Sequence, residues 1–346
     1  MSDLQIGLSI AAGLVLAGVV AHNTWTARKN APRQAVPEAA VEPALDSERG
    51  PISDDGEIRL PEFNLPAAPR RPAMDALIDV IATIALEGAH TAVSGEAALA
   101  AMPTTRRAGT KPFAIEGYNL NNEVWEVPMA GERYGGFQAG VQLANRSGAL
   151  NDIEYSEFVV KTQACADTIN GTPEFPEMLE EVARARELDQ FASAHDAQLS
   201  FTLRARNASW SPGYIHQNAA RLGFVAGVIP GRMVLPAAEE GLAPVLVLSF
   251  DSQAALAEDP AQSAIRDITL HLDVAQVDRA EEPFARMRDT ALAMAQAMDG
   301  AITDDNGQPL VAQTMDVIGT ELQALYDVLE QRDLAAGSTL ARRLFS

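Results

Sequence analysis

The chain has 346 residues, a formal net charge of −21 at pH 7 and a pI near 4.6. This length accommodates one large or two modest domains together with a tail. The negative charge argues against nucleic acid, or a general anionic membrane surface, as the partner of the protein body, because both would repel it. The single cysteine, Cys165, excludes an intramolecular disulfide framework and fits a reducing compartment. Its apolar helical surroundings favour a structural thiol over a reactive one.

An uncharged apolar segment begins the chain. At 1.5 Å per residue, about 18 residues just cross a thin hydrocarbon core, and we predict a transmembrane helix over residues 4–22 with residues 1–3 facing outward. An aromatic residue and three basic residues follow the segment: Trp25, Arg28, Lys29 and Arg33. This charge bias predicts that the C-terminal side is cytoplasmic. The alternative, a cleaved signal peptide, would have the opposite charge order and a small-x-small cleavage site.

A proline-rich linker is predicted over residues 23–75. Eight prolines fall between residues 30 and 74, with scattered acidic residues and few paired apolar ones. Such a composition cannot bury enough apolar surface to offset its conformational entropy. We therefore expect a flexible, partly polyproline tether on the cytoplasmic side.

The rest of the chain predicts two α+β units, residues 76–195 and 196–346. In the first, apolar periodicity predicts strands over residues 77–86, 112–118, 124–127, 137–144 and 171–175, and helices over residues 94–102, 153–169 and 176–194. In the second, it predicts strands over residues 198–205, 231–235, 245–250, 268–274 and 301–303, and helices over residues 214–222, 283–298 and 314–331.

The order of elements in the first unit recurs in the second, which suggests a tandem duplication. Two unrelated α+β halves, or one continuous domain, remain as alternatives because residue identity between the units is low. Each of these readings gives the same α+β fold class, with antiparallel sheets each covered by helices on one face.

Residues 283–298 form the most clearly predicted helix. Acidic residues before Pro283 favour its N-terminus. Gly300 is expected to adopt the left-handed conformation that caps the helix, before an edge strand and a polar turn. One helical face carries apolar side chains at steps of three and four: Phe284, Met287, Ala291, Met294 and Met298.

This helix, followed by a buried pair and Asp304-Asp305, resembles the penultimate helix and last strand of the ZipA family. These are membrane-tethered bacterial division proteins that hold the tubulin-like protein FtsZ at the inner membrane. The beginning of the chain is also similar to that family, with Asp3-Leu4-Gln5 before the apolar segment and Trp25-Thr26-Ala27-Arg28-Lys29 after it. The two similar regions lie at opposite ends of the chain.

The resemblance implies a single-pass adaptor of the cell inner membrane that acts in septation. Residues 1–3 would be periplasmic, and residues 196–346 would bind the C-terminal tail of FtsZ in the cytoplasm. Residues 76–195 would be a degenerate copy of the same domain. The implied partners are the FtsZ tail and the lipid bilayer, through residues 4–22, with self-association left open.

The sequence carries no pattern for catalysis. Its five histidines are scattered, without a His-Glu-x-x-His motif or Cys/His pairs, and no glycine-rich phosphate loop follows a strand. We therefore expect no enzyme, no catalytic residue, no cofactor and no metal. Two other functions stay open, namely an interaction module of unknown partner in which the two copies pair, and a membrane-anchored periplasmic enzyme.

Strand alternation predicts which side chains of the second unit face outward. Apolar residues alternate with Ser200 and Thr202 in one strand, and Val247, Ser249, Thr269 and His271 take the same outward parity in two others. The resemblance adds two apolar groove residues from the strand Arg232-Met233-Val234-Leu235. The alternative places both in the core, with Val234 exposed. The predicted FtsZ-tail groove comprises Met233, Leu235, Ser200, Thr202, Val247, Ser249, Thr269 and His271, although the family usually has a large aromatic where His271 stands.

Overall fold

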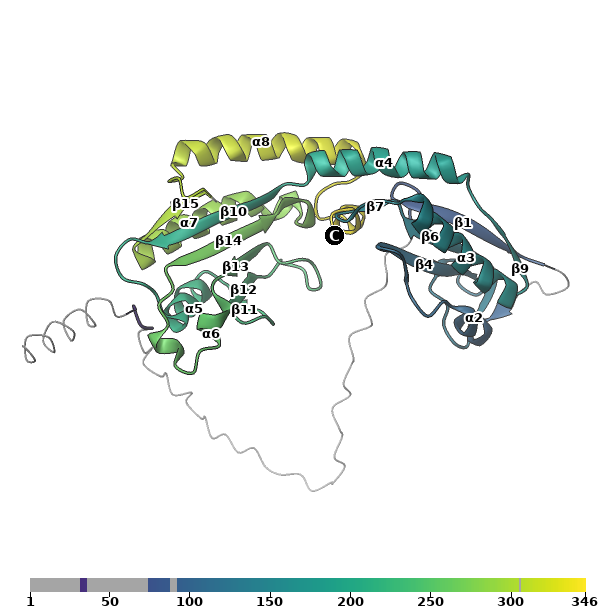
Figure 1. Cartoon of the computed structure of the whole chain (residues 1–346), viewed down its shortest axis with the longest axis horizontal. Helices are drawn as coiled ribbons and strands as arrows, with labels where there is room; N and C mark the ends of the chain where they lie inside the picture. Colours follow the sequence, from purple (N-terminus) through teal and green to yellow (C-terminus); the bar gives the residue numbers. More distant parts are fainter. Residues whose placement is uncertain (1–31, 36–73, 88–91, 305) are drawn as a thin grey trace, which may run out of the picture.

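The computed structural model describes residues 32–35, 74–87, 92–304 and 306–346, which form two α+β domains (Figure 1). The predicted transmembrane segment, residues 4–22, and most of the predicted linker lie outside the described residues. Within those four ranges, no helix is long and apolar enough to cross a membrane.

The first domain contains an antiparallel sheet whose main strands lie in the order β3-β4-β6-β1-β9. The strands are β1 (Asp79–Leu86), β3 (Arg107–Ala108), β4 (Lys111–Asn119), β6 (Arg133–Gln142) and β9 (Gly171–Glu174). Two short strands extend it, namely β2 (Val93–Ser94) and β5 (Trp125–Glu126). A separate hairpin joins β7 (Ala144–Asn145) and β8 (Gly148–Ala149).

Three helices accompany this sheet: α2 (Gly95–Ala101), α3 (Asp152–Thr168) and α4 (Met178–His195). A capping box begins α3, in which the Asn151 side chain accepts backbone hydrogen bonds and the Glu154 carboxylate accepts one from the Asn151 amide. Phe158 of α3 packs edge-on against Phe113 of β4, with the ring centroids 6.0 Å apart. This aromatic contact fixes α3 on one face of the sheet.

The second domain contains an antiparallel sheet in the order β11-β12-β13-β14-β10-β15. Its strands are β10 (Gln198–Ala205), β11 (Val225–Ala226), β12 (Arg232–Leu235), β13 (Leu246–Ser249), β14 (Asp267–Asp273) and β15 (Gly300–Thr303). Its helices are α5 (Pro212–Ala220), α6 (Ser252–Ala255), α7 (Pro283–Met298), α8 (Ala312–Gln331) and α9 (Thr339–Leu344). The strand predicted over residues 198–205 and the helix predicted over residues 283–298 have the predicted bounds.

The two sheets share one strand order. In chain order β1, β3, β4, β6 and β9 correspond to β10, β12, β13, β14 and β15, and the spatial order β3-β4-β6-β1-β9 corresponds to β12-β13-β14-β10-β15. The helices also fall at corresponding places, because α3 precedes β9 as α7 precedes β15, and α4 and α8 follow those strands.

The C-terminal end of α7 differs by one residue from the expectation. Asp299, not Gly300, takes the left-handed conformation, with φ 56° and ψ 51°, while Gly300 already belongs to β15. Aspartate tolerates this conformation because its short carboxylate can accept local hydrogen bonds. Here it accepts one from Asn207 Nδ2 at 2.9 Å.

Helix α9 lies between the two domains, where the C-terminus is marked in Figure 1. On the first-domain side, the Arg343 guanidinium makes two bonds to the Asp79 carboxylate, at 2.5 and 2.9 Å, and Gln142 Nε2 donates to the Arg343 carbonyl at 2.8 Å. On the second-domain side, Gln276 Nε2 donates to the Phe345 carbonyl at 2.8 Å. The end of the chain therefore contacts both domains.

Candidate peptide-binding groove

Among the residues that the structure describes, the second sheet has one face packed on helices and one face without them. Helix α7 contacts β10, β14 and β15, and the residues beneath it, such as Phe201, Leu203 and Leu270, are buried. The alternate side chains, which point away from α7, are half-buried on the three central strands β10, β13 and β14. The structure puts six of the predicted groove residues there: Ser200, Thr202, Val247, Ser249, Thr269 and His271.

Met233 and Leu235 do not lie on this open face. They are only 2% and 6% exposed, and in the β12–β13 register they stand opposite Leu248 and Leu246, which are fully buried. Directly opposed residues of antiparallel strands share a face, so both side chains point toward the helices. The prediction that they line the groove is therefore wrong, and the alternative holds, because Val234 stands opposite Val247 on the open face.

The open face is hollowed into a cavity of about 470 Å³. Ser200, Val247, Ser249 and His271 line it among the predicted residues. Ala243 and Pro244 contribute a wall from the loop between β12 and β13. The predicted residues Thr202 and Thr269 share the same face further along the strands, outside the cavity lining. We refer to this cavity as the groove.

His271 lies at the centre of the groove and joins three strands. Its Nδ1 is 2.9 Å from Ser200 Oγ on β10, and its Nε2 is 2.8 Å from Ser249 Oγ on β13. Which ring nitrogen donates to a serine hydroxyl and which accepts depends on the tautomer of the imidazole. These bonds hold the ring across the sheet and give the groove a polar centre.

Arg232 is a groove residue that the sequence reasoning did not select. It lies at the start of β12, is exposed, and lines the groove opposite Ser249. Among the described residues, no hydrogen bond or ion pair engages its guanidinium, so its charge is free to meet a ligand. Its outward parity, opposite to that of Met233, was the signal in the sequence that could have identified it.

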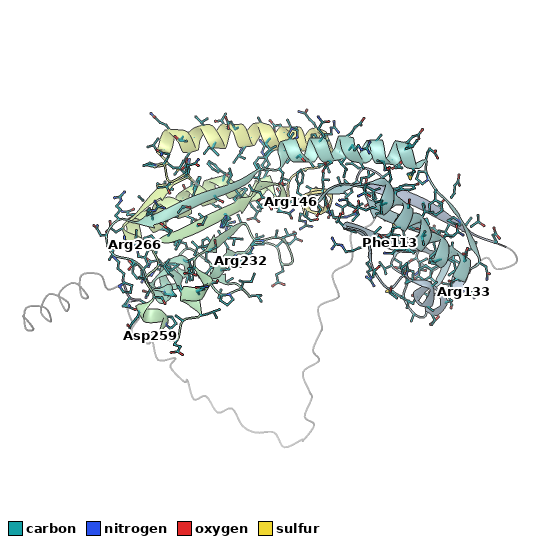
Figure 2. The ribbon with its side chains drawn as sticks, in the orientation of Figure 1. Phe113, Arg133, Arg146, Arg232, Asp259 and Arg266 are labelled. Carbon is teal, nitrogen blue, oxygen red and sulfur yellow. The ribbon has the colours of Figure 1, made fainter. Side chains whose placement is uncertain are left out.

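The first domain supplies a residue at one end of the groove. Asp273 lines the groove at the end of β14, and Arg146, from the turn between β7 and β8, contacts both oxygens of its carboxylate at 2.7 and 2.9 Å. Arg146 also bonds Asp196 at 2.7 and 2.8 Å, which raises the pKa of the guanidinium. Figure 2 labels Arg146 between the domains and Arg232 on the second domain.

Outside the groove, neither the Cys165 thiol nor a metal-ligand cluster offers a reactive site among the described residues. Burial raises the pKa of the Cys165 thiol to about 11, so the thiolate needed for reaction is scarce at neutral pH. In the part of the chain that the structure describes, no three His, Cys, Asp or Glu side chains gather in a way that could hold a metal ion.

Comparison with known families matches residues 251–321 to the model of the ZipA C-terminal FtsZ-binding domain. The match begins before α6 and ends within α8, so it includes β14 with His271, and α7 with β15. No curated protein matches the chain. The helix-to-strand motif that suggested the resemblance lies wholly inside the matched residues. Residues 251–321 of the second domain are therefore similar to the ZipA C-terminal FtsZ-binding domain.

Proposed function

We propose that the groove binds the C-terminal tail of FtsZ, and that residues 4–22 anchor the protein so that FtsZ filaments are tethered to the inner membrane at the septum. The observation that carries the proposal is the location of the groove. It occupies the uncovered sheet face of the domain that has the FtsZ-binding family match, with His271 inside the matched residues.

The groove favours an extended or helical peptide with mixed chemistry. Val247, which is half-buried, offers an apolar contact, while His271 and its serine partners offer hydrogen bonds. Arg232 adds a positive charge at the rim. Such a groove suits a tail that combines apolar anchors with at least one carboxylate, because the apolar anchors provide affinity and the charge selects orientation.

The test is fluorescence anisotropy with a labelled FtsZ C-terminal peptide and the full chain in detergent. Val247→Glu should weaken binding by roughly 1–3 kcal/mol, or about 5- to 150-fold, the scale of losing one apolar anchor. Val317→Glu on α8 is the matched control, because Val317 is 58% exposed and lies away from the groove. Equal affinity for the Val247 variant and the control would overturn the groove assignment.

The membrane part of the proposal rests on the basic residues that follow the apolar segment. An alkaline phosphatase fused after Ser346 should be inactive, since that enzyme matures only in the periplasm. The same fusion placed before residue 4 should be active. Activity of the C-terminal fusion would contradict the cytoplasmic location of both domains.

We also propose that the two domains arose by duplication and that the first now supports the second. The shared strand order favours common origin. The open face of the first sheet is partly covered by the chain itself, because a Cβ added at Gly140 would lie 2.5 Å from Met74 Sδ and the Met74 amide donates to Glu116 at 3.3 Å. The role that we assign to the first domain is to brace the second through α9 and Arg146.

A further inference from the structure

A short segment of the predicted linker is docked on the second domain. Residues 32–35 lie beside the strand-like segment at Trp210, with which Arg33 forms a parallel β-bridge. The Arg33 amide donates to the Ser209 carbonyl at 2.7 Å, and the Ser211 amide donates to the Arg33 carbonyl at 3.0 Å. Trp210 also forms an antiparallel bridge with Ile265, so Arg33 adds a third backbone to an existing pair.

The side chain of Arg33 is held at the C-terminal end of α7. Its Nη2 lies 2.9 Å from Asp299 Oδ2, and its Nη1 donates to the Met298 carbonyl at 3.2 Å. The last carbonyls of a helix lack partners within the helix and carry partial negative charge, so they favour a cation. The buried Trp210 indole donates to the same Met298 carbonyl at 2.9 Å, which fixes the position of the acceptor.

We propose that residues 32–35 are a docking strand that holds the second domain beside the membrane anchor of its own chain. This inference rests on the proposed function in one respect, the anchor at residues 4–22. From residue 22 to residue 32 a fully extended chain spans at most about 35 Å. The docking strand therefore places the groove at short range from the bilayer, and residues 36–73 connect the second domain to the first instead of spacing the second domain from the membrane.

The docking strand belongs to the same chain as the domain that binds it. Residues 36–73 could extend to roughly 130 Å, so the covalent connection allows a strand from the same chain or from a neighbour. A tethered segment has an effective concentration in the millimolar range. That concentration favours docking within one chain over exchange between copies.

A disulfide can trap this contact. A Cβ added at Gly213, an exposed residue in the first turn of α5, would lie 3.7 Å from the Cβ of Ala35, and disulfides join Cβ atoms about 3.5–4.5 Å apart. The Ala35→Cys/Gly213→Cys variant of the full chain, with Cys165→Ala to remove the native thiol, is reconstituted in nanodiscs and oxidised. We expect a crosslinked monomer of altered mobility on non-reducing gels.

Other outcomes overturn the inference. A crosslinked dimer means that the strand comes from a second copy, and no crosslink means that it does not dock. The control pair Ala35→Cys/Ser193→Cys, with the second thiol exposed on α4, should stay reduced. Arg33→Glu should slow crosslinking at least tenfold, whereas Arg186→Glu, the same charge change at an exposed position of α4, should leave the rate unchanged.

The distance to the membrane is tested separately. A dye on Ser252→Cys in α6, in the Cys165→Ala background, should transfer energy to acceptor lipids, and Arg33→Glu should lower the transfer while Arg186→Glu does not. Equal transfer in all three proteins, or none in the parent, overturns the proximity claim. Peptide anisotropy on the same samples separates the proposals, since loss of FtsZ-tail binding with an intact crosslink would remove the proposed function and leave the docking strand in place.

Discussion

Two neighbouring residues of β12 should respond in opposite ways to the same substitution. Met233 is 2% exposed and packs toward the helices, whereas Val234 is half-buried on the open face. Removing a buried methionine side chain costs about 2–5 kcal/mol, and an unpaired carboxylate in its place adds several kcal/mol more. The total for Met233→Glu is comparable to the ~5–15 kcal/mol that keeps a domain folded.

The assay is urea denaturation followed by circular dichroism, combined with peptide anisotropy. Met233→Glu should leave the second domain unfolded or close to it. Val234→Glu should stay within about 1 kcal/mol of the parent, the range of strand propensities, yet weaken FtsZ-tail binding because it places a charge beside Val247. A folded Met233→Glu protein that has lost peptide binding would refute the assigned face of β12.

Three further predictions concern other buried groups. Arg343→Ala should lower the free energy of unfolding by about 3–5 kcal/mol, because it leaves the Asp79 carboxylate, 2% exposed, without its cation; a loss under about 1 kcal/mol in urea titrations would mean that water replaces the guanidinium. Tyr326→Phe should raise stability by about 1 kcal/mol, because the buried hydroxyl has no hydrogen-bond partner among the described residues. Burial raises the pKa of Tyr326 to about 12, above the value of about 10 for an unfolded chain. Ionisation of this group therefore leaves the free energy of unfolding unchanged below pH 10 and lowers it as pH rises toward 12. Equal alkaline stability profiles for parent and Tyr326→Phe would contradict this. The Cys165 thiol, with a pKa of about 11, should react with an aromatic disulfide at pH 8 roughly a hundredfold more slowly than free cysteine, and equal rates in the native and urea-unfolded protein would contradict its burial.

The elements predicted best from the sequence are those with long, regular patterns. Strand β10 alternates apolar and polar residues over its full length, and α7 repeats apolar residues at helical spacing, so local pattern and tertiary burial agree. Strand β12 has four residues, three of them apolar. Such a short strand does not reveal its parity without its partner, and the register with β13 decided it.

Other features could not be predicted because they depend on contacts between domains. Helix α9 has only six residues and is stabilised by both domains through Arg343 and the chain end. Hairpin β7–β8 has two residues in each strand, and nothing in its sequence indicates that Arg146 reaches Asp273. The same holds for residues 32–35, because nothing in their sequence indicates that Arg33 reaches the C-terminal end of α7.

The first domain should influence peptide binding through Arg146. This guanidinium bonds Asp196, at the end of α4, and Asp273, at the end of β14. It therefore links the position of the first domain to the charge at the end of the groove. Arg146→Ala frees the Asp273 carboxylate at the groove end, which should repel an acidic peptide and weaken binding more at low salt than at high salt, because screening suppresses the repulsion. Arg146→Lys keeps the charge but cannot make paired bonds to two carboxylates, so it should preserve most of the affinity while lowering stability by about 1 kcal/mol. Equal losses of affinity in the two variants, without salt dependence, would mean that the domains are coupled by shape alone and not by this charge.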